Sequence, residues 1–291
     1  MKKCLIVVNS YNKLPSYFYE AERLQEEFSL LGVEAKIVKT EELHILISSD
    51  IKIKPIEADF IVSFDKDILI LKALEKLGYK VFNNATSIEN CDNKFLTHIV
   101  LSNEGIDMPK TIPGLLCYSG DKKVSDEYFD FIQKSLQYPL IFKECYGSLG
   151  KNVYMVNDET ELKECIEKFN KGSYLVQEYV ESSRGRDCRI IVIGHKYIAS
   201  MIRENDHDFR SNIGAGGIGR KFDPTQEFIE VAIKSSKILN LDYCGIDILF
   251  GKDNKPILCE VNSNAFFKEF ERITAINVAK IYVEYILNKV Y

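Results

Sequence analysis

Two carboxylates and an amide near the C-terminal end of the chain have the spacing of a metal site, in the segment GIDILFGKDNKPILCEVN. If this segment is a hairpin with its turn centred on Asp253 and Asn254, Asp247 and Glu260 lie directly opposite each other. The two-residue period of a strand then places Asn262 on the same face as Glu260. Opposed carboxylates repel each other unless a cation lies between them, and oxygen ligands suit Mg²⁺ or Mn²⁺. We therefore predict a divalent-metal site, with a solvent-facing polar hairpin as the alternative.

A magnesium site with few carboxylates indicates a nucleoside triphosphate, because Mg²⁺ completes its coordination shell with water and substrate phosphates. The sequence has no G-x-x-x-x-G-K-[ST] motif, so a P-loop is excluded and the phosphate-binding cations must come from elsewhere. Lys143 closes a short apolar strand and faces the loop Gly147–Gly150, whose amides could fold over phosphate. Lys94 is a second candidate. The alternatives are an ordinary hairpin lysine and a solvated helix lysine.

The segment Gly214–Gly219 matches G-x-G-x-x-G, but that fingerprint has meaning only between a buried strand and a helix. The polar stretch HDFRSN precedes it, and the next helix begins several residues too late, near Pro224. The first strand–helix loop, NSYNKLPS, contains no glycine either. A nicotinamide or flavin site is therefore excluded. The glycine segment is instead a candidate anion-binding nest of backbone amides, or a flexible surface loop.

The composition is that of an ordinary globular protein of 291 residues, 46% hydrophobic, with a net charge of −5. The negative charge argues against broad affinity for nucleic acid or anionic lipid, so an anionic ligand must meet a local group of cations. No apolar run is long enough to span a membrane and no signal peptide opens the chain, so we expect a cytoplasmic protein. Eight cysteines without a C-x-x-C pair are expected to be structural. The sequence leaves a homo-oligomer open.

Three structural parts must position these candidates, and we expect them at residues 1–90, 91–180 and 181–291. The first part alternates strand and helix signals with short glycine stops, which indicates a parallel α/β layer. Its expected strands are 4–10, 34–38, 58–64 and 80–84, and its expected helices are 17–31 and 69–77.

The second part is expected to be a small α+β domain, with helices and strands that alternate in short segments. Its expected helices are 87–104, 125–136 and one that follows Asp158, and its expected strands are 138–144, 152–156 and 173–180. Asp158 and Glu161 have the spacing of a capping box.

The third part is expected to be rich in strands, at 187–194, 195–204, 244–250 and 256–262. One helix is expected to begin with Asp223 as N-cap, Pro224 at N1 and Gln226 at N3. A last helix is expected from about Thr274 to Asn288.

Six segments, in this order along the chain, resemble motifs of the ATP-grasp carboxylate–amine ligases. They are CDNKFLTHIVLSNEGIDMPKT, YPLIFKECYGSLGKNVYMV, YLVQEYVESSRGRDCRIIVIG, DFRSN, CGIDILF and CEVNSN. The resemblance is greatest to the branch that contains the ribosomal-protein glutamate ligase RimK and the lysine-biosynthesis ligase LysX. It implies an ATP-grasp fold, of α/β and α+β class, with an N-terminal parallel α/β (pre-ATP-grasp) domain.

The resemblance also implies a role for each motif residue. Lys94 and Lys143 would hold the α- and β-phosphates of ATP beneath a mobile loop at Gly147–Asn152. Backbone groups of Glu178 and Val180 would bind the adenine edge. The full implied nucleotide set is Lys94, Lys143, Gly147, Ser148, Gln177, Glu178, Tyr179, Val180, Asp187 at the ribose, and Arg210, Ser211 and Asn212 near the terminal phosphate and acyl group. The implied metal ligands are Asp247, Glu260 and Asn262, which would hold two Mg²⁺ or Mn²⁺ ions.

The implied reaction begins with attack of a substrate carboxylate on the γ-phosphate of ATP, which gives an acyl phosphate. Attack by an amine then gives an amide, ADP and phosphate, without a protein nucleophile. Lys143 and Arg210 would stabilise the charge of the transferring group. The expected substrates are a small-molecule or peptide carboxylate and an amine, with an amino acid such as glutamate as the leading expectation.

Other functions stay open at this point. Ser263–Lys268 departs from the Ser-Pro-Gly turn of the glutamate ligases and is closer in style to LysX-like members. A LysX-like, D-alanine–D-alanine-type or purine-pathway ligase is therefore one alternative, and an ATP-binding regulator without turnover is another. Four arginines are candidates for binding an acidic substrate, or are solvated or structural: Arg184, Arg186, Arg189 and Arg203.

Overall fold

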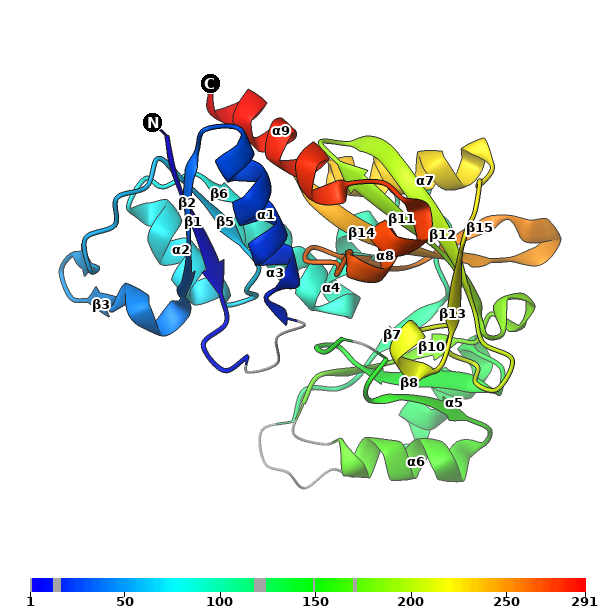
Figure 1. The fold of residues 1–291 in the computed structure, drawn as a ribbon. Coiled ribbons are helices and arrows are strands. Elements are labelled where there is room, and N and C mark those ends of the chain that lie inside the picture. The colour runs from blue at the N-terminus through cyan, green and yellow to red at the C-terminus, as the bar shows by residue number, and fades with distance from the viewer. Residues whose placement is uncertain (1, 13–16, 118–123, 149, 170–171) are drawn as a thin grey trace.

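The computed structural model describes residues 2–12, 17–117, 124–148, 150–169 and 172–291, which form three main β-sheets with helices packed around them (Figure 1). The first sheet has the strand order β2-β1-β5-β6, and every pair in it is parallel. Its elements are β1 Lys3–Val8, α1 Tyr19–Leu30, β2 Glu34–Lys39, β5 Phe60–Ser63, α2 Ile68–Lys76, β6 Val81–Phe82 and α3 Ala85–Asp92. The predicted parallel α/β layer is confirmed.

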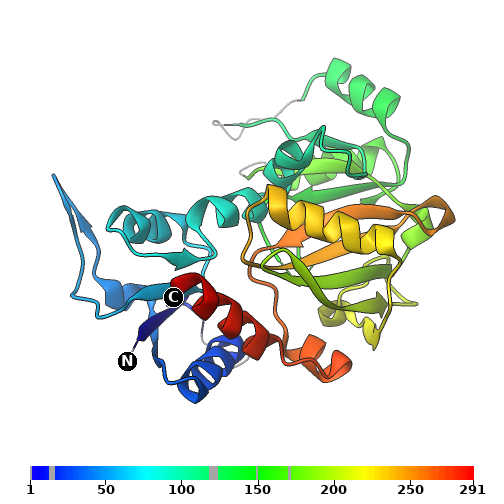
Figure 2. The same cartoon turned by 90° about the horizontal axis from the view of Figure 1, so that it is seen from above.

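A short hairpin of β3 Leu46–Ile47 and β4 Ile51–Lys52 projects from this layer (Figure 2). Strands of two residues have no readable period, so the sequence does not predict this hairpin.

The single helix expected over 87–104 is instead two helices, α3 and α4 Lys94–Leu101. They are separated at Asn93, whose backbone is extended and whose side chain accepts hydrogen bonds from the N–H groups of Phe95 (3.0 Å) and Leu96 (3.1 Å). These bonds satisfy amides that have no partner within the new helix. The break makes Lys94 the first residue of α4, where its side chain is buried.

The second sheet is antiparallel, in the order β7-β10-β8-β9. Its elements are β7 Thr111–Pro113, α5 Asp126–Ser135, β8 Leu140–Glu144, β9 Val153–Val156, α6 Glu159–Lys168 and β10 Tyr174–Glu178. Helices α5 and α6 cover one face, where Phe142 lies in their shared core. The two-residue period of β8 therefore turns Ile141 and Lys143 toward the opposite face.

The predicted capping box of α6 is half formed. The Asp158 side chain accepts the N–H of Glu161 at 2.9 Å. The Glu161 carboxylate, however, accepts the N–H of Asn157 at 2.7 Å.

The third sheet is antiparallel, in the order β13-β12-β11-β14-β15. Its strands are β11 Arg186–Ile193, β12 Lys196–Glu204, β13 Ile218–Lys221, β14 Tyr243–Phe250 and β15 Pro256–Asn262, and its helices are α7 Gln226–Ile238, α8 Lys268–Thr274 and α9 Val278–Val290. Strand β13 begins at Ile218, near the end of the glycine segment, and was not expected. Helix α7 has Thr225 as its N-cap instead of Asp223. The last helix begins at Val278, where the side chain of Asn277 caps it, and not at Thr274.

The C-terminal helix α9 packs back against α1 of the first layer (Figure 1). One hydrophobic core contains Phe28 and Phe60 from that layer together with Tyr243 and Tyr282. The buried Asn83 side chain adds four hydrogen bonds across the same boundary, to backbone groups of Asp242, Tyr243 and Ser263. The first layer and the third sheet are therefore firmly joined. The three-part division of the chain remains our proposal.

No helix within the described ranges is both long and apolar enough to cross a membrane.

Candidate active site

The nucleotide and metal residues suggested by the sequence all line one cavity of about 730 Å³. They are Lys94, Lys143, Gly147, Ser148, Gln177, Glu178, Tyr179, Val180, Asp187, Arg210, Ser211, Asn212, Asp247, Glu260 and Asn262. Segments from all three sheets supply these walls. The structure thus brings the predicted residues together, while the role of each one is a proposal made below.

Asp247 and Glu260 are paired across β14 and β15, as the sequence predicted. Nearer the turn, the residue pairs differ from those of the simple hairpin, because Phe250 pairs with Pro256 and Ile248 with Leu258. A β-bulge at Cys259 then adds one residue to β15 and restores the pairing of the two acids. Asn262 reaches the same face, where its Nδ2 lies 3.5 Å from Asp247 Oδ2.

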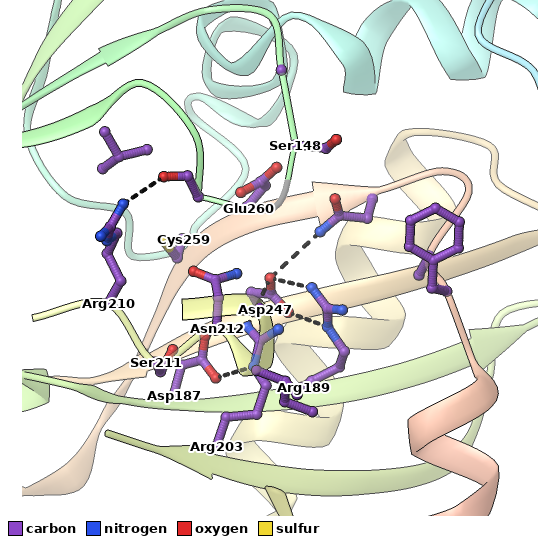
Figure 3. Close-up of a pocket in the computed structure, with 18 of the residues that line it drawn as sticks. Ser148, Asp187, Arg189, Arg203, Arg210, Ser211, Asn212, Asp247, Cys259 and Glu260 are labelled. Atoms are coloured by element: carbon purple, nitrogen blue, oxygen red, sulfur yellow. Dashed lines mark hydrogen bonds and ion pairs between the residues drawn. The ribbon is translucent and has the colours of Figure 1, made fainter. Parts of the chain in front are cut away.

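Asp247 is held by two arginines (Figure 3). Arg189 is its direct partner across β11 and β14, with Nε 2.7 Å from Oδ1 and Nη2 2.6 Å from Oδ2. Arg203 Nη2 lies 3.0 Å from Asp247 Oδ2 and also bonds both carboxylate oxygens of Asp187. Burial alone would raise the pKa of Asp247, but the two guanidinium groups outweigh it and hold the pKa below its usual value.

These ion pairs correct the electrostatic argument made from the sequence. The repulsion between the opposed acids does not require a metal, because Arg189 and Arg203 balance Asp247, and Lys94 Nζ lies 3.7 Å from Glu260 Oε1. A metal therefore has to be argued from the donor set. No group of three or more His, Cys, Asp and Glu side chains in the described part of the chain could hold a metal ion.

The donors nevertheless fit magnesium. Asp247, Glu260 and Asn262 each have a side-chain oxygen that could bind a metal ion, and the side chain of Glu260 is 26% exposed within the cavity wall. Mg²⁺ is commonly bound by one or two carboxylates and completes its shell with water and substrate phosphates. A magnesium site here therefore does not need a coordination shell made entirely of protein carboxylates. A phosphate-bearing ligand would supply the remaining oxygens.

Two cations donate hydrogen bonds to backbone carbonyls of Gly147 and Gly150, in the loop at Gly147–Asn152. Lys94 Nζ donates to the carbonyl of Gly147 at 2.9 Å, and Arg210 Nη1 donates to the carbonyl of Gly150 at 2.9 Å. Leu149, within this loop, lies outside the described residues. Arg210 also pairs with Asp208, and this hydrogen bonding lowers the pKa of Asp208. Buried Lys143 lines the same cavity from β8.

Glu178 and Val180, at the end of β10, both line the cavity. The N–H of Glu178 donates to the carbonyl of Lys110 at 2.9 Å, and the Glu178 side chain accepts the N–H of Lys110 at 3.1 Å. The carbonyl of Val180 accepts the N–H of Ser183 at 3.0 Å. Neither the Glu178 carbonyl nor the Val180 N–H takes part in these three bonds. An acceptor and a donor two residues apart suit the edge of an adenine base.

His98 lies beneath this strand, near Gln177 and Thr111, at 3.4 Å from each. Burial lowers the pKa of His98 to about 4, and the positive charge of Lys143 acts in the same direction. His98 is therefore neutral at physiological pH and adds no charge to the site.

Three amides of the predicted anion nest in the glycine segment are used in local backbone hydrogen bonds, while Gly214 lines the cavity. The N–H groups of Ala215, Gly216 and Gly217 donate to the carbonyls of Asn212 and Ile213. The glycine at 217 allows a close backbone approach, since a Cβ there would lie 2.1 Å from the carbonyl oxygen of Ser211.

The first layer supplies cavity residues that sequence reasoning missed. Asn9 follows β1, and Phe64, Asp65 and Lys66 follow β5, so they lie at the carboxyl ends of neighbouring parallel strands. Ligands bind at this edge of parallel sheets, which is the signal that could have identified them. Of the four arginines considered from the sequence, Arg184 is exposed and Arg186 stacks on Phe250 with its guanidinium carbon 4.2 Å from the ring centre.

Comparison with known proteins agrees with this geometry. Residues 91–286 match the RimK-like ATP-grasp domain. The chain is 36% identical to human N-acetylaspartylglutamate synthase A over 232 residues, which cover 78% of this chain but only 57% of that protein. It is 32% identical over 287 residues to a probable α-L-glutamate ligase 1 of Shewanella baltica, covering 92% of this chain and 91% of that one.

The fold is shared with a solved ligase structure. Bacillus anthracis D-alanine–D-alanine ligase complexed with ATP superimposes with a TM-score of 0.76 at 16% identity, over 100% of this chain and 97% of that one. The fold class predicted from the sequence is thus confirmed. Together with the domain match and the relatives above 30% identity, these findings show that the chain belongs to the RimK-like ATP-grasp family.

Proposed function

We propose that the chain is an ATP- and Mg²⁺-dependent ligase that joins a carboxylate to an amine through an acyl phosphate. The observation that carries this proposal is the cavity itself, which gathers buried lysines, arginines and an oxygen-donor trio around one space. Such a site can bind a triphosphate and stabilise phosphoryl transfer without a protein nucleophile. The relatives named as synthases and ligases support the same reaction class.

In this proposal the adenine binds at the end of β10. The Glu178 carbonyl accepts from the exocyclic amine and the Val180 N–H donates to the ring, while Gln177 and Tyr179 line the pocket beside them. Lys94 and Lys143 bind the α- and β-phosphates, and Gly147 and Ser148 close over them. Lys94 then exchanges its bond to the Gly147 carbonyl for a phosphate oxygen, so the loop position depends on the nucleotide.

The terminal phosphate lies near Asp247, Glu260 and Asn262 in the same proposal. Mg²⁺ bound by these residues would neutralise phosphate charge during transfer. Arg210 and Lys143 stabilise the transferring group, and Ser211 and Asn212 position it. Asp187 acts through Arg203, which it holds with a bidentate ion pair, and this differs from the direct ribose contact first expected.

Arg189 adds a further cation that the motif comparison did not assign. Its side chain is 14% exposed and lines the cavity beside Asp247. Its Nε and Nη2 bond Asp247, so we assign the remaining nitrogen, Nη1, to the substrate carboxylate and the acyl phosphate.

The glutamate part of the relatives' names suggests the amine substrate. N-Acetylaspartylglutamate synthase A, β-citrylglutamate synthase B and the α-L-glutamate ligase share that word. We propose L-glutamate as the amine, with N-acetyl-L-aspartate and citrate as the first carboxylates to test. The D-alanine ligase shares the fold alone, so it does not favour a D-alanine substrate.

A screen of ADP release with measured product masses tests this function. Each carboxylate is paired with L-glutamate and with other amines in the presence of ATP and Mg²⁺. The proposal predicts that ADP is released only when both substrates are present. It also predicts a product whose mass is the sum of the masses of the acid and the amine, less the mass of one water. ATP binding without ADP release for every pair would instead favour a regulatory ATP-binding protein.

A further inference from the structure

Glu20, in the first turn of α1, is a buried carboxylate and one of the residues that line the same cavity. The residue is 2% exposed. Its Oε1 accepts the N–H of Phe267 at 3.0 Å. Its Oε2 is buried and has no hydrogen-bond partner among the described residues. A buried oxygen of this kind costs free energy unless a ligand or water bonds to it.

Within the described ranges, no lysine, arginine or histidine forms an ion pair with Glu20. Glu27, two turns later on the same helix, is a buried carboxylate whose charge is compensated in the usual way. It forms an ion pair with Arg23 at 2.9 Å and accepts a hydrogen bond from Asn277 at 2.7 Å. Glu271 of α8 and Tyr243 of β14 interact electrostatically with Glu20, and neither one brings a positive charge. Lys268 of α8 lines the same cavity and acts on Glu20 through its backbone N–H.

The surroundings also affect the protonation of Glu20. Burial raises the pKa of Glu20 to about 7, although backbone N–H groups, including that of Phe267, act in the opposite direction. A carboxyl with this pKa can both accept and release a proton at neutral pH, as a general base must.

The position of Glu20 separates it from the nucleotide residues. It comes from the first layer and contacts the start of α8, whereas the adenine strand belongs to the second sheet. Tyr17, Ala265 and Phe270 also line the cavity, and no ligand has been assigned to them.

We propose that Glu20 binds the ammonium group of the amine substrate and takes a proton from it before the amine attacks. This inference rests on the proposed ligase function. One proton passes from the ammonium nitrogen to the Glu20 carboxylate, which frees the nitrogen lone pair. That pair forms the C–N bond at the acyl carbon, the bond from this carbon to the phosphate oxygen breaks, and the phosphate leaves with the bonding electrons. The remaining excess proton on nitrogen passes to the departing phosphate.

Glu20 also holds the backbone at the start of α8, so a purely structural role has to be distinguished. Hydroxylamine provides the distinction. It is uncharged at neutral pH and captures an acyl phosphate as a hydroxamate, and it needs neither an ammonium site nor a base. A structural defect lowers hydroxamate and amide formation together, whereas loss of the amine site lowers only the amide.

The test compares wild type with Glu20→Gln, using ATP, Mg²⁺ and whichever of N-acetyl-L-aspartate or citrate supports ADP release. Glutamine keeps an acceptor for the Phe267 N–H, so the melting temperature is expected to change little. Hydroxamate formation is expected to stay within about threefold of wild type, while amide formation with L-glutamate falls by about 100-fold or more. Glu20→Asp retains the carboxylate, so its amide formation is expected to be about tenfold faster than that of Glu20→Gln.

Glu27→Gln is the matched control, since it neutralises a buried carboxylate on the same helix that does not line the cavity. It is expected to leave both products within about threefold of wild type. Amide formation by Glu20→Gln within about tenfold of wild type overturns the proposal. An equal loss of both products in a folded Glu20→Gln or Glu20→Asp protein also overturns it. If wild type itself forms neither product with any carboxylate, the proposed function fails, and this inference fails with it.

Discussion

Arg189 and Asp247 are direct partners across strands β11 and β14, and two hydrogen bonds of 2.7 and 2.6 Å join the guanidinium to the carboxylate. The carboxylate proposed as a metal ligand is therefore already compensated by protein cations. Arg203 strengthens this arrangement, because it bonds Asp187 and Asp247 together. Asp247 thus has a part in stability beside its proposed part in metal binding, while Glu260 has only the 3.7 Å contact with Lys94 among the ion pairs of the described residues.

Glu260→Gln is expected to lower carboxylate-dependent ADP release by at least about 100-fold, because one charged oxygen ligand for Mg²⁺ is lost. The free energy of unfolding should change by less than about 1 kcal/mol, since Glu260 is partly exposed and its Lys94 contact is long. Coupled ADP assays and urea titration measure the two effects. Asp253→Asn, at the exposed turn of the same hairpin, is the control and should match wild type. Turnover within tenfold of wild type at saturating Mg²⁺ would reject Glu260 as a ligand.

Asp247→Asn is expected to abolish ADP release and, unlike Glu260→Gln, to destabilise the fold. Removing its charge leaves the buried guanidinium of Arg203 and that of Arg189 without one of their partners. Breaking a buried ion pair from one side costs about 3 kcal/mol or more, so the urea midpoint should fall well below that of Glu260→Gln. Equal midpoints for the two variants would show that the arginines do not depend on Asp247.

Arg210→Ala is expected to lower ADP release by about 100-fold or more with little change in melting temperature. The side chain of Arg210 is 31% exposed, yet it joins the loop carbonyl of Gly150 to the proposed phosphate site. Arg220→Ala is the matched control, because Arg220 also pairs with an acid, Glu204, but lies away from the cavity and is 68% exposed. Similar activities of the two variants would remove Arg210 from the site.

His98 predicts a pH dependence of stability. Its pKa is lowered to about 4 in the folded protein, against 6.5 for a free histidine. As pH falls below 6.5, the unfolded chain therefore binds a proton that the folded chain does not, and stability is lost down to about pH 4. Wild type should lose about 1 to 3 kcal/mol more than His98→Gln across this window.

Urea titrations of wild type and His98→Gln at several pH values measure that difference. His207→Gln, at an exposed position, should follow the wild-type curve. Parallel curves for wild type and His98→Gln would show that His98 is not held neutral by burial.

The sequence predicted most of the fold where the hydrophobic periodicity was clear and glycines marked the ends of helices. Strand–helix alternation with glycine stops predicted the first layer, and the paired acids were predicted opposite each other. The hairpin also shows the limit of such reasoning, because a bulge at Cys259 had to compensate an irregular turn. The break at Asn93 was readable in principle, since an asparagine before a new apolar period is a common N-cap.

The ion pairs of the site could not be predicted in the same way. Arg189 and Asp247 are far apart in the sequence and meet only because β11 and β14 are neighbours in the third sheet. Glu20 meets the start of α8 because α8 and α9 return to the first layer. Contacts of this kind depend on the order of strands in a sheet and on which distant helices pack together. The hydrophobic periodicity and residue spacing of one segment do not determine either.

If the γ-phosphate of ATP activates a carboxylate, one carboxylate oxygen is transferred to phosphate, and ¹⁸O labelling can follow this transfer. The carboxylate substrate that supports ADP release is labelled with ¹⁸O in its carboxyl group and incubated with the protein, ATP, Mg²⁺ and L-glutamate. Formation of an acyl phosphate predicts ADP and an amide, with one ¹⁸O atom in the phosphate for each amide formed. Unlabelled phosphate alongside the amide, or release of AMP and pyrophosphate, would contradict it.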